Sequence, residues 1–396
     1  MYFFQFVFFL SVGIVFYNYA GYAILTYLMK LVAGSPGRKL GRSTDLPSVS
    51  FIVAAYNEEQ FIEKKIINSL SQNYPASSIE FIFITDGSSD GTNAVLERYP
   101  SITLLHQPER RGKSAAINRA VSLASNEILI FSDANTTLNE DATLHIARHY
   151  LDERVGGVAG EKKVASLTGT GDEVGAGEGI YWKYESLLKK IDSGFYSVVG
   201  AAGELFSLRR SLYERIPDHV ILDDFILSLR AALKGYRIIY EPAAYATESP
   251  SFSIKDERKR KVRIAAGGFQ SIGMLKGLLL FWKYPRLSFL YISHRVLRWT
   301  LSPLCLILAF VSNGVLYFSQ EPVFKVSFLC QCLFYGMSGI AAVVPPDKCP
   351  KLFKIPYYFT FMNISVIMGF FRFLSGKQSA IWEKAKRSPS AIVIKE

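Results

Sequence analysis

Sequence features that mark several large functional classes are missing from this chain of 396 residues. It contains no G-x-G-x-x-G or Walker-type phosphate loop, which argues against a dinucleotide oxidoreductase or a nucleoside triphosphatase. The four cysteines all lie in or beside the C-terminal apolar region: Cys305, Cys330, Cys332 and Cys349. Their spacing fits neither a common zinc site nor a secreted disulfide framework. We therefore expect four reduced packing residues.

Motifs for nucleic-acid binding are also missing, although the formal net charge is +11. Many of the cations flank apolar segments, where they would meet anionic lipid head groups. We therefore expect membrane lipid, and not nucleic acid, to be the partner of this charge.

Apolar, aromatic-rich segments lie at both ends of the chain. Residues 3–29 are long enough to span a bilayer, and they lack the basic start and small-residue cleavage site of a signal peptide. This pattern predicts a retained anchor. Cations follow it at Lys30, Arg38, Lys39 and Arg42. The positive-inside rule then places the N-terminus outside and the residues after Arg42 in the cytoplasm.

Three further apolar segments cover residues 299–318, 323–344 and 355–374. If all three span, the lysines between the last two are cytoplasmic, but the basic tail at 375–396 is outside, which violates the positive-inside rule. We therefore expect one segment to be re-entrant or interfacial, and the sequence does not say which. Residues 271–298 are predicted to form interfacial helices, because their apolar run is too short to span.

Strand and helix patterns alternate in the middle of the chain. Short runs of β-forming residues are predicted as strands at 48–55, 79–85, 102–105 and 127–132, with helices between them. Such repeats predict an α/β fold with a mostly parallel sheet, and a ligand crevice at the carboxyl ends of its strands. This is a nucleotide-binding kind of architecture.

Local patterns add three smaller expectations. Asn57, followed by Gln60, makes a plausible capping box for the first helix after the first strand. The Gly-rich stretch at 151–178 is predicted to be a mobile loop near the mouth of the crevice. Residues 180–191 are predicted to be a helix, on which Tyr184 and Glu185 either meet an acceptor or lie on a surface face.

Carboxylates follow the predicted strands at the edge where a ligand would bind. Asp86 ends the stretch FIFITD, and Asp133 ends ILIFSD. Asp223 and Asp224 open an amphipathic helical pattern, so all four carboxylates are expected around one crevice. Asp133 and Asn135 could hold a hard divalent cation, Mg²⁺ or Mn²⁺, together with phosphate oxygens. Alone, each acidic residue could equally cap a turn or a helix.

The combination of motifs is more specific than any one of them. VAAYNEE, DGSSDGT, RGKSAAIN, FSDANT and LDD occur in this order, followed by a helix that ends in KGYRIIYEP. From about residue 47 to residue 270 the chain closely resembles the family 2 glycosyltransferases of the GT-A fold. Members with a membrane anchor and helices after the catalytic domain resemble bacterial exopolysaccharide and poly-N-acetylglucosamine synthases.

The resemblance implies a donor site for a nucleotide-diphospho sugar, usually a UDP-sugar. It assigns the base and the ribose to the first two strand ends, which here carry Ala55, Tyr56, Asn57, Glu58 and Asp86. Lys113 falls where the family has a basic residue near the nucleotide. Asp133 matches the first aspartate of the D-x-D metal motif, whereas Asn135 replaces the second one and offers a neutral carbonyl oxygen.

The resemblance also implies a catalytic and an acceptor side. Asp224 matches the general base, with Asp223 expected to cap its helix. Gly203 and Glu204 match a loop that lies below the acceptor in the family. We expect Asp223 to contact the acceptor as well. Arg260 and Arg263 fall in the region of the Q-x-x-R-W motif, where arginine suits a departing diphosphate. The motif's tryptophan is replaced by Ile264.

These observations predict a multi-pass protein of a bacterial-type inner membrane with a cytoplasmic catalytic domain. Its expected parts are an anchor (1–30), a GT-A catalytic domain (45–270), interfacial helices (271–298), C-terminal transmembrane segments (299–374) and a basic tail (375–396). The expected reaction is inverting, metal-dependent transfer of one sugar to a lipid-linked saccharide acceptor.

Three alternatives to this reading stay open. A processive polysaccharide synthase is the first, a non-catalytic nucleotide-sugar-binding subunit is the second, and a transporter is the weakest because the apolar segments carry few ionisable residues. Polysaccharide-export proteins are candidate partners.

Overall fold

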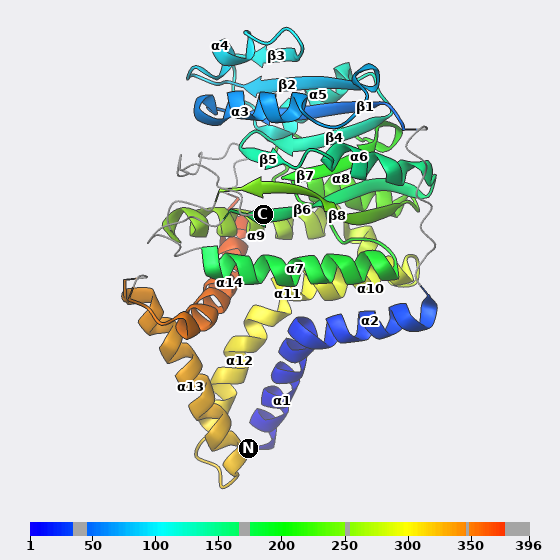
Figure 1. Cartoon of the computed structure of the whole chain (residues 1–396). Helices are drawn as coiled ribbons and strands as arrows, with labels where there is room; N and C mark the ends of the chain where they lie inside the picture. The colour runs from blue at the N-terminus through cyan, green and yellow to red at the C-terminus, as the bar shows by residue number, and fades with distance from the viewer. Residues whose placement is uncertain (35–45, 166–174, 250–253, 346–347, 377–396) are drawn as a thin grey trace.

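The computed structural model describes residues 1–34, 46–165, 175–249, 254–345 and 348–376. Figure 1 shows a sheet with its helices at one end of the molecule and a group of long apolar helices at the other. Arg38, Lys39, Arg42 and the tail after residue 376, which carried part of the expected topology, lie outside the described residues.

One eight-stranded sheet is present in the described part of the chain, in the order β3-β2-β1-β4-β7-β6-β8-β5. The strands are β1 (Val49–Ala55), β2 (Ile79–Asp86), β3 (Thr103–Gln107), β4 (Ile128–Asp133), β5 (Thr136–Leu138), β6 (Val155–Val164), β7 (Leu205–Arg209) and β8 (Arg237–Glu248). Within these strands four of the seven pairings are parallel and three, those of β4 with β7, β6 with β7 and β5 with β8, are antiparallel. The expected α/β sheet is confirmed, and it is mixed.

Alternation along the central strands sends side chains to two separate cores. Phe51 and Val53 of β1 pack on the face covered by α3 (Glu59–Leu70), α4 (Thr92–Leu96) and α6 (Ala142–Ala147). Ile52 packs on the other face, which is covered by α5 (Lys113–Leu123), α7 (Gly175–Phe195) and α8 (Asp223–Leu233). Both faces are therefore buried, as a sheet with parallel central strands requires.

Strand β6 lies where the sequence predicted a loop, so that prediction is wrong for residues 155–164. The glycines that suggested a loop are needed for close packing inside the sheet. A Cβ on Gly160 would lie 2.7 Å from Leu205 Cδ2, and a Cβ on Gly157 would lie 2.8 Å from the Ser207 carbonyl oxygen. The absence of side chains at these two positions allows β6 to fit between its neighbours.

Helices α1 (Tyr2–Phe16), α12 (Leu301–Leu316) and α13 (Pro322–Val343) extend away from the sheet in Figure 1. By length and composition, three helices in the described residues could cross a membrane: Tyr2–Ala33, Pro322–Val343 and Leu352–Leu374. A fourth candidate is the pair Pro285–Trp299 and Leu301–Leu316, which is bent by 52°.

Between the sheet and these helices lies a layer of helices that run across the molecule (Figure 1). Besides α7 it contains α2 (Tyr22–Ala33), α9 (Ile254–Met274), α10 (Pro285–Tyr291), the π-turn at Ile292–Val296 and α11 (Leu297–Trp299). The apolar run predicted to be interfacial forms a short 3₁₀ turn, Lys276–Leu279, followed by a loop that exposes Phe281 and Trp282.

Helix α14 (Lys351–Leu374) differs from α12 and α13 in what it contacts. It packs against α13 and also against α9, on the side of the molecule that holds the sheet. The approach to α9 is close, because a Cβ on Gly369 would lie 2.5 Å from Ala265 Cβ. The last apolar helix therefore returns toward the sheet.

Buried polar contacts join the crossing helices to one another. Asp192 of α7 accepts hydrogen bonds from Tyr22 (2.6 Å) and from His294 Nδ1 (2.7 Å). Glu185, two turns earlier on the same face of α7, pairs with Arg295 at 3.1 Å and with Arg298. Because Glu185, Asp192 and Arg298 are buried, loss of a partner would leave an uncompensated charge.

Gly200 packs closely against Phe225 of α8. Gly200 has φ +83°, and a Cβ added there would lie 2.0 Å from Phe225 Cδ2. Gly200→Ala should therefore lower the free energy of unfolding by at least about 2 kcal/mol, through strain and overpacking together. Gly235→Ala is the matched control, because Gly235 has φ +92° with no atom within 4 Å. In thermal unfolding measured in detergent, the unfolding temperature of Gly200→Ala should be well below that of this control. Equal losses of stability in the two variants would contradict a role for the Phe225 contact.

Candidate active site

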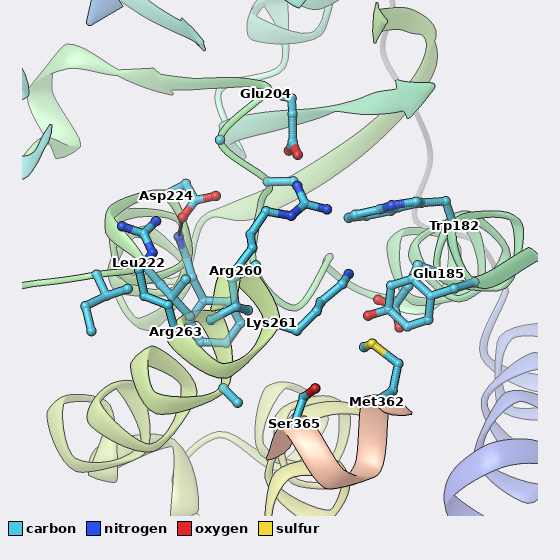
Figure 2. Close-up of a pocket in the computed structure, with 18 of the residues that line it drawn as sticks. Trp182, Glu185, Glu204, Leu222, Asp224, Arg260, Lys261, Arg263, Met362 and Ser365 are labelled. Atoms are coloured by element: carbon cyan, nitrogen blue, oxygen red, sulfur yellow. Dashed lines mark hydrogen bonds between the residues drawn. The ribbon is translucent and has the colours of Figure 1, made fainter. Parts of the chain in front are cut away.

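A cavity of about 930 Å³ opens at the carboxyl ends of the central strands and continues to the crossing helices. It is lined by residues of β4, α5, α8 and α9 and also by residues of α7, α11 and α14. Figure 2 shows Asp224, Arg260, Lys261, Trp182 and Glu204 around it, with Met362 and Ser365 of α14 at one end. The cavity therefore joins the sheet edge to an apolar helix.

Lys113 and Asp133 face each other on the sheet side of the cavity. Asp133 ends β4, Lys113 begins α5, and Lys113 Nζ lies 2.7 Å from Asp133 Oδ1. Burial lowers the pKa of Lys113, but attraction to Asp133, Asp223 and Asp224 outweighs burial and raises the pKa above its ordinary value. Lys113 is therefore a permanent cation beside three carboxylates.

Asp223 and Asp224 both line the cavity from the first turn of α8. The N-cap residue of α8 is Leu222, without a side-chain cap, so the prediction that Asp223 caps this helix is wrong. Asp224 Oδ1 accepts a hydrogen bond from the Phe225 amide at 2.8 Å. A Cβ on Gly203 would lie 3.4 Å from Asp224 Oδ2 and 2.9 Å from Lys113 Nζ, so the small residue leaves room for both groups.

Asp224 has the electrostatic character of a base that works near neutral pH. Burial, followed by repulsion from Asp223, raises its pKa to about 7, although Lys113 acts in the opposite direction. A carboxylate with such a pKa is a better proton acceptor than an ordinary aspartate and is still ionised above neutrality.

Glu204 lies on the opposite side of the cavity from α14 (Figure 2). Its carboxylate is 2.5 Å from Lys162 Nζ, and Lys162 also pairs with Glu248. Burial raises the pKa of Glu204, but the attraction to Lys162 outweighs burial, so the pKa lies below its ordinary value. Glu204 is thus held as a hydrogen-bond acceptor.

Helix α9 brings Arg260 and Arg263 to the cavity. Their contact with a departing diphosphate stays a prediction. Arg260 is 3.1 Å from Glu257 and 3.6 Å from Glu248. Ile264 lines the same cavity. Lys259 also lines it.

The first strand end reaches the cavity through Tyr56, Glu58 and Ala54. Ala55 points the other way and packs in the core beneath α3, so its assignment to the donor site is not supported by its position. Asn57 has φ +53° and binds the next loop, since its amide oxygen accepts from the Ser89 amide at 2.7 Å. It does not cap α3, whose N-cap residue is Glu58, so the capping-box prediction is wrong.

Asp86 is not among the residues that line the cavity. Its carboxylate accepts hydrogen bonds from the amides of Arg111 (3.0 Å) and Gly112 (2.6 Å), and Arg119 lies 3.6 Å away. In this structure Asp86 therefore holds the loop before α5, which carries Lys113. A direct contact with a nucleotide base stays a prediction.

Helix α7 contributes Glu185, which the sequence offered as an acceptor contact, and also Trp182 and Lys189, for which the sequence predicted no role. Glu185 is 2% exposed, so the alternative of a surface face is wrong. No motif marks these residues, but their spacing of three and four positions places them on one helix face. That spacing was the signal available in the sequence.

Asp133 and Asn135 both line the cavity and offer one carboxylate and one amide oxygen. No cluster of three or more His, Cys, Asp or Glu suited to a metal is found in the described residues. Mg²⁺ and Mn²⁺ commonly take few protein carboxylates and complete their coordination with phosphate oxygens and water. The two residues therefore fit a cation that arrives with a diphosphate.

Known glycosyltransferases resemble this chain in sequence. Residues 50–216 match the family described as Glycosyl transferase family 2. A poly-beta-1,6-N-acetyl-D-glucosamine synthase from Staphylococcus aureus (strain COL) is 27% identical over 278 residues, which are 68% of this chain and 66% of that protein. The synthase of the same name from Staphylococcus epidermidis is 25% identical over 86% of this chain and 87% of that protein.

A solved structure shows the same fold. The mannosyltransferase from Pyrobaculum calidifontis, determined with GDP-mannose and Mn²⁺, superimposes with a TM-score of 0.70 and 22% sequence identity. The match covers 94% of this chain and 99% of that one. The expected GT-A fold is therefore confirmed.

The raised pKa of Asp224 predicts how sugar transfer depends on pH. If ionised Asp224 accepts a proton, the logarithm of the rate rises with unit slope up to about pH 7 and is level above it, because protonation removes the base. Asp223→Asn removes the neighbouring negative charge, which should lower the pKa of Asp224 and shift the rising part of the pH–rate profile to lower pH. Initial rates between pH 5 and pH 9 test both expectations. A flat profile, or a limb that Asp223→Asn does not move, would exclude Asp224 as the titrating group.

Proposed function

We propose, from the match of residues 50–216 to the family described as Glycosyl transferase family 2, that this glycosyltransferase moves a sugar from a nucleotide-diphospho sugar to a membrane-held acceptor with inversion. The observation that carries the proposal is the single cavity, in which a base with a raised pKa, a lysine–aspartate pair and an apolar helix meet. A UDP-sugar is the donor we favour.

The proposed chemistry is one direct displacement. Asp224 takes the proton of the acceptor hydroxyl while that oxygen forms a bond to the anomeric carbon. The bond from that carbon to the diphosphate oxygen breaks on the opposite face, and the nucleoside diphosphate leaves with the electron pair. One base facing one leaving group inverts the anomeric configuration.

Positive groups near the leaving diphosphate support this step. Lys113, Arg260 and Arg263 all line the cavity, and their hydrogen bonds to phosphate oxygens strengthen as charge develops. Asp133 and Asn135 would hold Mg²⁺ or Mn²⁺, which when bound supplies further charge neutralisation at the diphosphate. Tyr56, Asn57 and Glu58 belong to the donor end, with Asp86 positioning the loop that carries Lys113.

The packing of α14 suggests how the chain crosses the membrane. If α1, α12 and α13 span and α14 lies against α9 at the interface, the chain crosses three times. The lysines between α13 and α14 and the basic tail then lie on the same side as the catalytic domain. This arrangement satisfies the positive-inside rule at both places, which three C-terminal spans could not.

The acceptor is proposed to be a saccharide, carried on a lipid, that enters beside α14. Met362 and Ser365 of this apolar helix line the same cavity as Asp224, so an acceptor that rests in the bilayer can reach the base. A processive polysaccharide synthase is a second candidate, favoured by the Staphylococcus relatives that carry that name. Product size from purified protein separates the two, because long polymer without a partner enzyme would exclude single addition.

Donor use tests the function directly. Purified protein in lipid should release nucleoside diphosphate from at least one donor in a screen of UDP-N-acetylglucosamine, other UDP-hexoses and GDP-mannose. Asp224→Asn should slow release roughly a hundredfold or more, with donor affinity nearly unchanged, because only the general base is lost. Asp223→Asn, the matched control, should cost much less. Reversed effects in the pair would overturn the assignment of the base.

Metal removal gives a separate prediction. Excess chelator should abolish transfer, and Mg²⁺ or Mn²⁺ should restore it, because the donor diphosphate needs the cation held by Asp133. Asp133→Ala should be inactive, whereas Asn135→Asp should be tolerated since it restores a second carboxylate. Full transfer in chelator, measured on metal-free enzyme, would remove the cation from the proposed reaction.

A further inference from the structure

The part of the cavity away from Asp224 has no role in the displacement described above. We call it the inner chamber and define it by Trp182, Glu185, Lys189, Lys261, Tyr358 and Met362. Figure 2 shows Trp182 and Asp224 on opposite sides of the cavity, with Arg260 and Lys261 between them. A ligand that fills both places must extend beyond its reacting group.

Trp182 is the centre of the inner chamber. Three ammonium groups lie around its ring, with Nζ 4.8 Å from the ring centroid for Lys162, 5.6 Å for Lys261 and 5.7 Å for Lys189. An aromatic wall with hydrogen-bond donors and acceptors at its rim suits a ligand that has both apolar C–H surface and many hydroxyl groups.

Most cations around the chamber are already held by an acidic side chain, which leaves few of them for a charged ligand. Lys162 pairs with Glu204, and Lys261 is 3.4 Å from Glu257. Glu185 pairs with Arg295 and Arg298. A phosphate group would have to compete with these carboxylates for its hydrogen-bond donors.

Lys189 is the exception to this pairing. Its side chain is 2% exposed, and its Nζ has no hydrogen-bond partner among the described residues. A buried donor without a partner costs free energy, and a ligand oxygen in the chamber would satisfy it. Lys189 therefore indicates that the chamber is built around an oxygen-bearing ligand.

We propose that the inner chamber binds a sugar unit of the acceptor that lies at least one residue away from the reacting hydroxyl, with Trp182 as its platform and Lys189 as its hydrogen-bond donor. The proposal rests on the proposed transferase function and adds to it a binding site for a second sugar unit of the acceptor. In this proposal the aromatic platform lies on α7, whereas the position that corresponds to the tryptophan of Q-x-x-R-W holds Ile264. The proposal predicts that the enzyme recognises more than one sugar of the acceptor.

The test uses full-length protein in lipid, the donor found in the screen, and β-linked N-acetylglucosamine oligosaccharides of one to four units. For the wild type, the acceptor KM should fall at least tenfold as the acceptor grows from one to three units. Trp182→Leu should abolish this dependence on length and leave the donor KM within about twofold, while Trp182→Phe should retain most of it. Trp282→Leu is the matched control, because Trp282 is 79% exposed and outside the cavity.

Lys189→Met should raise the KM of the longer acceptors severalfold, whereas Lys190→Met, which changes an exposed neighbour, should not. Donor hydrolysis without acceptor shows that each variant is folded. An unchanged dependence on length in Trp182→Leu, or transfer to a polyprenyl phosphate but to no oligosaccharide, would overturn the saccharide subsite. A wild type that releases nucleoside diphosphate from no donor would instead overturn the proposed function, and the subsite with it.

Discussion

The electrostatic balance around Lys113 is the constraint on which the site depends. Asp133 comes from a strand end, and Asp223 and Asp224 come from the start of α8, so folding brings three carboxylates around one partly buried ammonium group. Without the lysine, repulsion among them would favour protonation or separation. With it, Asp133 stays paired, and Lys113 limits the rise in the pKa of Asp224 that burial and Asp223 cause, so Asp224 remains available as a base. The same fold thus produces two aspartates with different chemistry.

Strand ends and their carboxylates could be predicted from the sequence because periodicity and turn residues are local signals. Partners from distant segments could not. Asn57 looked like a helix cap, but Ser88 and Ser89 of the following loop hold it in a left-handed conformation instead. Gly-rich β6 looked like a loop, because only its neighbours show why side chains are excluded there. Trp182 belongs to no motif, and only the ammonium groups of Lys162 and Lys261 beside its ring reveal it.

The crossing helices give the cavity its length. Asp192 and Glu185 tie α7 to the π-turn, α11 and α2 through buried hydrogen bonds and ion pairs. Such pairs fix geometry more than they add stability, because desolvation offsets much of their attraction. In this protein they hold one face of α7 toward the cavity. Together with α9 and α14, that face connects the chemistry at the strand ends to the apolar helices.

The central claim is a single displacement driven by one base, and the anomeric configuration of the product tests it most directly. With an α-linked nucleotide-diphospho sugar as the donor, NMR of the isolated product reports the anomeric configuration of the new linkage from the one-bond coupling between C1 and H1, which also separates the two anomers of mannose. The account predicts a β-linked product, since Asp224 activates the acceptor opposite the leaving diphosphate. An α-linked product would require a second displacement and would contradict the assignment of Asp224 as the sole base.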